Sequence, residues 1–415
     1  MSISGETSMQ QGKKALKEAG RVFLLSRLLL LVISAITMFS LRELLPFIKS
    51  QSAALHTPYQ NIPYSDDPSS LNAFFFSWYR WDVAHFVAIS AQGYADKLNT
   101  AFFPLWPMLQ WPVGLLFGGI FPGSYYIGGL LLANLCFYCA LVLLYKLLIA
   151  HFDVAIARRA LFYMAFAPYA LFFFAGYTES LFVLLCIASF LVLQGGQARN
   201  WWFAGLLGFL AALTRSSGVF LAIPYLVLYV QRFWIPSERA KHTWRAKLNA
   251  LIPIVLIPMG VIAYLLYLYF TKGDAFIFSL AEKNYWNRHF SFPWTTGYLV
   301  IKAFFVAPSW IYLLEHLVSF VFTLLPLLVL GFGWKRIPLH YRLFAATLAT
   351  FSLSFPLEGI SPLLSQPRYL LILFPIFVIL GIWGKRRSFH QWYFAFSLAF
   401  FILFTISFIC NLWVA

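Results

Sequence analysis

Residues 22–44 read VFLLSRLLLLVISAITMFSLREL, an apolar run interrupted by a single arginine until charged residues return near its end. About 20 apolar residues in an α-helix are enough to cross the roughly 30 Å hydrocarbon core of a bilayer. The run is too long for the apolar part of a signal peptide, and the segment before it is polar and basic. We therefore expect residues 1–21 to form a cytoplasmic N-terminal segment and residues 22–44 to form the first membrane helix.

Similar apolar runs recur along the chain. Of its 415 residues, 61% are hydrophobic and 11% are charged, whereas a soluble domain contains about 25% charged residues. The sequence therefore predicts an all-α, polytopic membrane protein with about 11 transmembrane helices, because helices satisfy their own backbone hydrogen bonds in lipid. We expect these helices near residues 22–44, 125–149, 156–175, 177–194, 201–213, 216–231, 249–271, 309–331, 339–356, 367–384 and 391–413.

Lysine and arginine residues cluster at alternate ends of these runs. The clusters are Lys13 to Arg21, Arg158 with Arg159, Arg199, Arg232 to Lys247, Lys335 to Arg342, and Lys385 to Arg387. By the positive-inside rule they mark the cytoplasmic face, with the N-terminus inside and the C-terminus outside. This topology accounts for the whole net charge of +16 and argues against nucleic-acid binding.

The apolar stretch at residues 102–122 contains Pro104, Pro107 and Pro112. If it were a full span, the later basic clusters would fall on the wrong side of the membrane, so it is better explained as an interfacial or re-entrant helix. A second interfacial helix is expected near residues 74–91.

Both interfacial helices belong to a large first external loop of residues 45–124. A second external loop is expected at residues 272–308, and residues 22–415 are expected to form one transmembrane domain. The two short segments on either side of Thr214 are typical of a broken or half-depth hairpin, which is tolerated where it lines a cavity.

Seven polar side chains fall at or near the external face in this topology. They are Asp82, His85, Tyr177, Glu179, Arg215, Glu358 and Arg368. Ionisable groups near membrane segments are costly and usually line substrate or ion paths. We therefore predict a single cavity with charges of both signs, suited to a polar, anionic substrate carried by a lipid. Asp82 and His85 are three residues apart and are expected to share a helical face.

Structural roles are alternatives for five of these residues. Asp82 could pair with Arg80 or cap a helix, and His85 could hydrogen-bond Asp82 or a backbone carbonyl. Glu179 could be an acid favoured by a helix N-terminus. Arg215 and Arg368 could each form a structural ion pair with Glu179 or Glu358. No metal site is predicted, because no other metal ligand has convincing spacing to His85.

Three blocks of sequence carry a resemblance to a known family. Trp81-Asp82-x-x-His85-Phe86, with Gly93-Tyr94 and Ala101-Phe102-Phe103-Pro104-x-x-Pro107, resembles the first-loop signature of the PIG-V family. Ala175-Gly176-Tyr177-Thr178-Glu179-Ser180 and Thr214-Arg215-Ser216-Ser217-Gly218 follow in the family's order, although the family often has Arg-Ser-Asn-Gly in the last block. Gln366-Pro367-Arg368-Tyr369 matches loosely, and residues 232–310 carry no recognised motif.

The PIG-V family includes the eukaryotic GPI mannosyltransferase 2 and bacterial relatives. The resemblance implies a GT-C glycosyltransferase with its active site on the lumenal or periplasmic side. Such enzymes use a polyprenyl-phosphate sugar, dolichyl-phosphate-mannose in eukaryotes, and invert the anomeric configuration. The catalytic acid of these enzymes lies in the first external loop, and the corresponding residue here is Asp82. Neither a cofactor nor a metal ion is expected.

On this basis we expect transfer of a hexose, mannose by the family pattern, to a lipid-linked or glycan acceptor. Arg215 and Arg368 would contact the departing phosphate, and His85, Tyr177, Glu179 and Glu358 would contact substrate. A bacterial inner membrane with a periplasmic site is expected, or an ER membrane in a eukaryote.

Two other classes of function remain open. A lipid-linked sugar transporter or flippase would also open a polar cavity to one side of the membrane. The sequence has no recognisable inverted repeat and no chain of charges toward the cytoplasmic face, which argues against this class. A non-catalytic scaffold subunit would have no use for an external cluster of acids.

Overall fold

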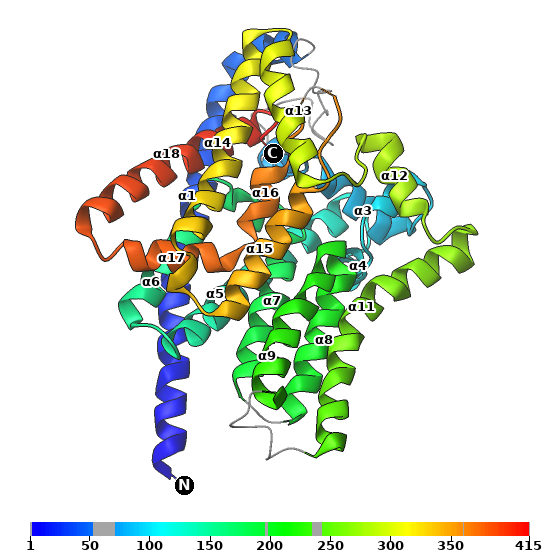
Figure 1. Cartoon of the computed structure of the whole chain (residues 1–415). Coiled ribbons are helices and arrows are strands. Elements are labelled where there is room, and N and C mark those ends of the chain that lie inside the picture. Colours follow the sequence, from blue (N-terminus) through cyan, green and yellow to red (C-terminus); the bar gives the residue numbers. More distant parts are fainter. Residues whose placement is uncertain (1, 53–70, 196–197, 235–242, 360, 415) are drawn as a thin grey trace.

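The computed structural model describes residues 2–52, 71–195, 198–234, 243–359 and 361–414, which fold almost entirely into helices (Figure 1). The α-helices of the first half are α1 (Ser2–Ser52), α2 (Leu71–Phe76), α3 (Asp82–Gln92), α4 (Leu105–Leu116), α5 (Gly123–Ile149), α6 (Val154–Ala165), α7 (Glu179–Gln194), α8 (Ala198–Thr214) and α9 (Ala222–Trp234). Those of the second half are α11 (Trp244–Lys272), α12 (Ile277–Trp286), α13 (Pro293–Val306), α14 (Trp310–Phe332), α15 (Leu339–Leu353), α16 (Gln366–Leu371), α17 (Phe374–Trp383) and α18 (Arg387–Ile409). Short 3₁₀ turns are η1 (Leu98–Ala101), η2 (Ala170–Phe173), η3 (Ser216–Leu221) and η4 (Trp334–Arg336).

The prediction of an all-α, multi-pass membrane protein is confirmed. Among the described residues, β pairing is limited to an isolated antiparallel bridge between Arg288 and Leu357. Six helical stretches are long and apolar enough to cross a membrane. They are Gln10–Ser40, Gly123–Ile149, Ser216–Trp234, Trp244–Lys272, Trp310–Phe332 and Arg387–Ile409.

The predicted number of about 11 spanning helices is not confirmed. The apolar helices α7 and α17 are too short to count among the six. The expected helix at residues 156–175 is also shorter than predicted, because α6 ends at Ala165 and η2 follows after a turn. Apolar sequence continues past these helix ends, so hydropathy alone overestimates their length.

Two helices in the first part of the chain differ from their predicted bounds. α1 is one continuous helix of 51 residues, about 76 Å long at 1.5 Å per residue, rather than a segment of 1–21 followed by a span of 22–44. The helix predicted at 74–91 is split into α2 and α3. The break falls at Trp81, whose φ of 46° lies in the left-handed region that interrupts a helix.

Between α1 and α5 the structure describes α2, α3 and α4, with η1 between α3 and α4. Residues 53–70 of the expected first loop lie outside the described residues, and the external placement of that loop stays a prediction. The second expected external loop, residues 272–308, contains α12 and α13. The chain also breaks at the predicted place around Thr214, where α8 ends, η3 follows and α9 continues.

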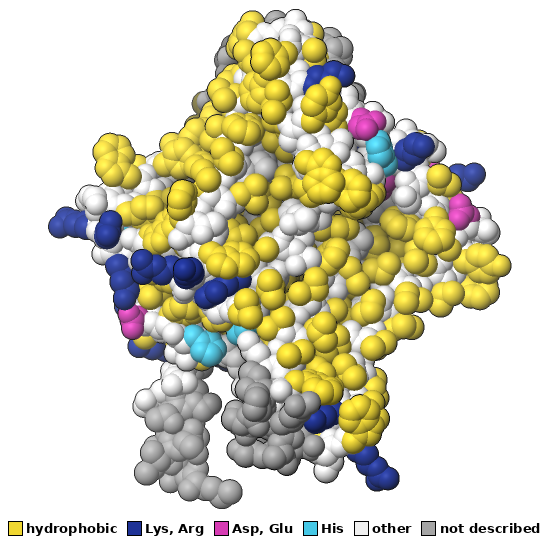
Figure 2. Space-filling model, viewed as in Figure 1, with side chains coloured by type: hydrophobic (Ala, Val, Ile, Leu, Met, Phe, Trp, Pro, Cys, Tyr) yellow, Lys and Arg dark blue, Asp and Glu magenta, His cyan; other side chains and the backbone are white. Residues whose placement is uncertain are grey.

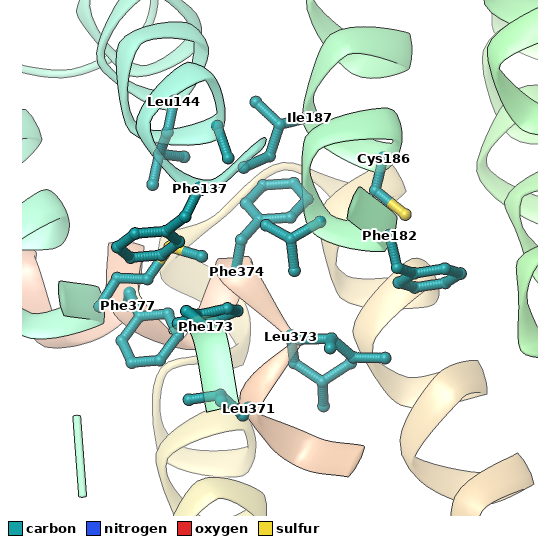
Figure 3. Packing of buried hydrophobic residues seen from close by; sticks show 14 of the residues in the cluster. Phe137, Leu144, Phe173, Phe182, Cys186, Ile187, Leu371, Leu373, Phe374 and Phe377 are labelled. Atoms are coloured by element: carbon teal, nitrogen blue, oxygen red, sulfur yellow. The ribbon is translucent and has the colours of Figure 1, made fainter. Parts of the chain in front are cut away.

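The helices pack around an aromatic and aliphatic core contributed by α5, η2, α7 and α17 (Figure 3). Phe137 of α5 and Phe173 of η2 stack with ring centroids 4.4 Å apart. Phe182 and Phe374 enter the same core from α7 and α17. Because lipid tails are as apolar as leucine, such helices associate through close packing more than through a hydrophobic driving force.

Much of the outer surface is apolar. Leu116, Phe305 and Phe332 are each more than three-quarters exposed, as expected for side chains that face lipid rather than water. Figure 2 shows apolar side chains over most of the visible face, with a band of lysine and arginine side chains on the left at about half height. This separation of apolar and basic surface fits a protein placed across a membrane.

Candidate functional site

Asp82 is the first residue of α3, and its position follows from the break at Trp81. The Trp81 ring packs edge-on against Phe408 of α18 at 4.9 Å and against Trp413 at 5.3 Å. These contacts fix the point at which α3 begins. A carboxylate at the first turn of a helix also lies near the positive end of the helix dipole. Asp82 is therefore held at a defined place and is 19% exposed.

Arg368 of α16 contacts two carboxylates. Its Nη1 atom donates to Asp82 Oδ2 at 2.7 Å, and its Nε atom lies 3.4 Å from Glu179 Oε1. The α16 helix starts at Gln366, whose side-chain amide donates to the Ser352 carbonyl at 2.8 Å. Arg368 is only 8% exposed, so its charge depends on these two partners rather than on water.

Glu179 begins α7 directly after a tight turn. Gly176 in that turn has a φ of 82°, a conformation that favours glycine. The Glu179 side chain is 1% exposed. Its Oε1 atom accepts a hydrogen bond from Arg215 Nη1 at 2.7 Å while also facing Arg368. Glu179 is thus the buried anion that joins two arginines.

Arg215 lies in extended conformation between α8 and η3. It can do so because η3 folds back against α8, and Gly218 permits the close approach. A Cβ atom on Gly218 would lie 2.4 Å from the backbone of Ala211. The second contact of Arg215 Nη1 is with Thr178 Oγ1 at 3.4 Å.

Tyr177 is fully buried beneath this ion-pair network. Its hydroxyl donates to the Arg80 carbonyl at 3.2 Å, and the Arg368 guanidinium carbon lies 5.1 Å from its ring centroid. Burial raises the pKa of Tyr177 well above its ordinary value, and the negative charge of Asp82 adds to this effect. The phenol therefore stays protonated and acts as a packing and hydrogen-bonding group.

A third arginine, Arg288, joins the site from the segment between α12 and α13. It donates to the Tyr369 hydroxyl and, from Nη2, to the Leu364 carbonyl at 2.9 Å. The guanidinium carbons of Arg215, Arg368 and Arg288 lie 5.1, 5.2 and 5.3 Å from the centroid of the Tyr369 ring. Three positive charges thus surround one aromatic ring, each in cation–π range.

Glu282 of α12 is electrostatically coupled to the same group of charges. Burial raises the pKa of Glu282, and the positive charge of Arg288 partly opposes that rise. Arg288 and Glu282 both lie in residues 232–310, where the sequence carries no motif, so the sequence did not predict them. The run Glu282 to Arg288 places two opposite charges near a turn, but many surface segments share such a pattern.

His85 and Glu358 are placed differently from the other predicted residues. His85 Nδ1 is 2.9 Å from Asn99 Oδ1, and its ring stacks on Phe102 with centroids 4.8 Å apart. Glu358 pairs with His289 Nε2 at 3.1 Å and is 43% exposed. The contacts described here for His85 and Glu358 lie outside the ion-pair network, although Glu358 follows Leu357, which is bridged to Arg288.

The structure thus brings five of the seven predicted residues into contact, namely Asp82, Tyr177, Glu179, Arg215 and Arg368. Asp82 pairs with Arg368. The alternative that Arg215 and Arg368 pair with Glu179 is correct for both. No cluster of three or more metal-ligating His, Cys, Asp or Glu side chains occurs among the described residues.

Three arginines and two acids form the contacts of this site. Asp82 and Glu179 pair with Arg215 and Arg368, while Arg288 lies against the same Tyr369 ring and is coupled to Glu282 through charge alone. The arrangement can therefore accept a further anion, and guanidinium groups suit phosphate because they can donate two parallel hydrogen bonds. Asp82 is the more exposed of the two acids, so its carboxylate is the one that a solvent or substrate group can reach.

Comparisons with known proteins agree with the motifs. The chain is 27% identical over 311 residues to GPI mannosyltransferase 2 of Schizosaccharomyces pombe, covering 70% of this chain and 60% of that protein. It is 29% identical over 216 residues to GPI alpha-1,6-mannosyltransferase 2 of Mus musculus, covering 47% of this chain and 42% of that protein. The chain thus spans about three-fifths of the first relative and less of the second.

Among solved structures, the apo form of the Archaeoglobus fulgidus oligosaccharyltransferase aligns over 92% of this chain and 55% of that one. The sequence identity is 13% and the TM-score is 0.42. A family description, Mannosyltransferase (PIG-V), matches residues 16–336, which include the segments carrying Asp82, Glu179, Arg215 and Arg288. With most of its length matched, the chain belongs to the PIG-V mannosyltransferase family.

Proposed function

We propose that this protein is an inverting glycosyltransferase that moves a mannosyl group from a polyprenyl-phosphate donor to a hydroxyl of a lipid-linked or glycan acceptor. The observation that carries the proposal is the contact of Asp82 with Arg368 inside a cluster of three arginines. The reaction requires an accessible carboxylate and positive charge near the leaving phosphate. This cluster contains both. Family membership supplies the sugar.

Asp82 is the base in this proposal. Its Oδ2 atom is occupied by Arg368, which leaves Oδ1 for the proton of the acceptor hydroxyl. Glu179 is 1% exposed and contacts two arginines, so it serves as a fixed counter-ion. The difference in exposure between Asp82 and Glu179 assigns different roles to two acids in one network.

The reaction forms one bond and breaks one. The acceptor oxygen bonds to the anomeric carbon from the face opposite the phosphate, and the bond from that carbon to the phosphate oxygen breaks. The acceptor proton passes to Asp82, and the electron pair leaves with the polyprenyl phosphate. The leaving phosphate needs no proton, so a paired acid and base of the glycosidase type is not required.

Arg215, Arg288 and Arg368 stabilise the departing phosphate. In the described structure Arg215 shares Glu179 with Arg368, whereas Arg368 also pairs with Asp82. Preorganised donors of this kind act where charge develops in the transition state. We propose that the site opens to the external side of the membrane, the periplasmic side in a bacterial member of the family, with the polyprenyl tail lying among the helices.

The test is transfer by Asp82→Asn in membranes supplied with polyprenyl-phosphate mannose. Asparagine keeps the size of the side chain and an oxygen that can accept from Arg368, but it cannot take the proton. We expect kcat to fall by about 10²–10⁴-fold, with donor binding preserved. Asp153→Asn is the matched control, because Asp153 is an exposed acid paired with Lys385 at 3.0 Å.

Transfer at the wild-type rate in Asp82→Asn would contradict this mechanism. The same membranes distinguish the alternative of a lipid-linked sugar transporter or flippase. That function predicts that wild-type protein moves the donor lipid across the bilayer without forming product, and that Asp82→Asn reduces this movement.

A further inference from the structure

A cleft lies where the N-terminal part of α1 meets α6 and α18, remote in sequence from Asp82. Glu18 and Val22 of α1, Arg158, Arg159 and Phe162 of α6, and His390 of α18 line it. Its volume is about 300 Å³, at the lower end of the range for small-ligand sites. The residues belong to elements that carry basic clusters, among them Lys385 to Arg387 at the start of α18.

The cleft carries excess positive charge. Arg158 forms a salt bridge with Glu18, and the two side chains are 51% and 13% exposed. Arg159 is oriented by the hydrogen bond from its Nε atom to the Gly381 carbonyl at 2.8 Å. No hydrogen-bond partner of Arg159 Nη2 occurs among the described residues. With two arginines and one glutamate, the lining has a net charge of +1 before any charge on His390.

The remaining lining is apolar and continues into surface suited to lipid. Val22, Leu161 and Phe162 form the apolar part of the cleft. Beyond Val22, α1 exposes Leu24, Leu25 and Leu28, each more than half exposed, and these lie within the candidate span Gln10–Ser40. The cleft therefore joins a cationic end to a lipid-facing helix surface, as a site at headgroup depth requires.

We propose that this cleft binds the phosphodiester headgroup of an anionic glycerophospholipid, such as phosphatidylglycerol. A single negative charge matches the net charge of the lining, and arginine can hold phosphate oxygens through paired hydrogen bonds. A zwitterionic headgroup would bring its ammonium group toward Arg158 and Arg159, which disfavours it. Basic pockets at the ends of membrane helices are a recurrent way of holding anionic lipids.

His390 also faces the cleft. Its Nδ1 atom is 2.7 Å from the Tyr163 hydroxyl, which fixes the ring in the lining. The phosphate would compete with Glu18 for Arg158, so removing the Glu18 charge should strengthen lipid binding. This sign distinguishes a headgroup site from a salt bridge that serves only to hold α1 against α6.

The test is native mass spectrometry of purified full-length protein in micelles that contain phosphatidylglycerol or phosphatidylcholine. We expect wild type to retain phosphatidylglycerol selectively. We expect the apparent affinity to fall about fivefold in Arg158→Gln and by a further similar factor in Arg158→Gln/Arg159→Gln. Glu18→Gln should raise it. Lys335→Gln/Arg336→Gln is the matched control, since it removes two exposed charges from another basic cluster.

Several results would overturn the proposal. One is equal retention of the two lipids by wild type, and another is an equal loss in the control variant. Unchanged retention in Arg158→Gln would do the same, and that variant keeps the Arg159 contact with Gly381 and hence the local packing. If soluble glycerol phosphate displaced bound phosphatidylglycerol as strongly as added phosphatidylglycerol does, the cleft would be a site for a soluble anion instead.

Discussion

Arg368 Nη1 and Asp82 Oδ2 meet at 2.7 Å although the two residues lie near opposite ends of the chain. The contact ties the first-loop helix α3 to α16. Removal of the arginine would leave Asp82 and the buried Glu179 short of positive charge, and unpaired buried charges are costly.

We therefore expect Arg368→Ala to lower the free energy of unfolding by about 3–5 kcal/mol and to abolish transfer. Arg368→Lys should recover part of the stability but little activity, because an ammonium group cannot make the planar, two-sided contact of a guanidinium. Thermal melts in detergent and transfer assays measure the two effects, with Arg336→Gln as an exposed control. Full activity in Arg368→Lys would show that only charge matters at this position.

The pair of Glu179 and Arg215 should behave as a coupled unit. Their charged atoms are 2.7 Å apart, and the side chains are 1% and 16% exposed. In a double-mutant cycle of Glu179→Gln, Arg215→Gln and the double variant, we expect a coupling free energy of about 0.5–3 kcal/mol. Additive effects on stability would mean that the contact contributes nothing beyond its separate parts.

Arg288 should affect donor binding more than folding. We expect Arg288→Gln to raise KM for the polyprenyl-phosphate donor by about tenfold, about 1.4 kcal/mol, because the phosphate loses one of three cationic partners. The neighbouring His289→Gln is the control, since His289 pairs with the exposed Glu358. An unchanged KM in Arg288→Gln would show that Arg288 does not contact the donor and that its role is to hydrogen-bond Tyr369.

Glu282 gives a prediction for pH. Burial raises the pKa of Glu282 in the folded protein, so its contribution to stability is present at acid pH and is lost as pH rises through the folded pKa. We expect Glu282→Gln to raise the melting temperature near neutral pH and to have little effect below the ordinary glutamate pKa of about 4.3. The exposed acid Asp96 supplies the control variant, Asp96→Asn. If the rise in melting temperature of Glu282→Gln were larger at acid pH than at neutral pH, the pKa of Glu282 would not be raised in the folded protein.

The meeting of Asp82, Glu179, Arg215 and Arg368 could be predicted from the sequence because membrane topology fixes the depth of each residue. Once the basic clusters define one face, acids and arginines at the other ends of the helices have little space in which to lie apart. The partner of each charge could not be predicted, because Glu179 and Glu358 are both acids near that face. Of these two acids, Glu179 is the one that contacts both arginines in the described part of the chain.

Two features escaped prediction for physical reasons. The left-handed backbone at Trp81 interrupts a sequence whose apolar pattern favours a continuous helix from 74 to 91, and tertiary contacts of the Trp81 ring accompany it. Arg288 reaches the site through the loop after α12, where the bridge to Leu357 sets its position. Neither hydropathy nor a local motif reports on such long-range contacts.

The three guanidinium groups around Tyr369 have a consequence for the cell. Their mutual repulsion is offset by Asp82, Glu179 and the coupled Glu282, and under the proposed function the donor phosphate adds a further counter-ion. Occupancy should then stabilise the folded chain in proportion to the logarithm of free donor concentration above its dissociation constant. The lifetime of the enzyme in the membrane would thereby follow the supply of its own lipid donor.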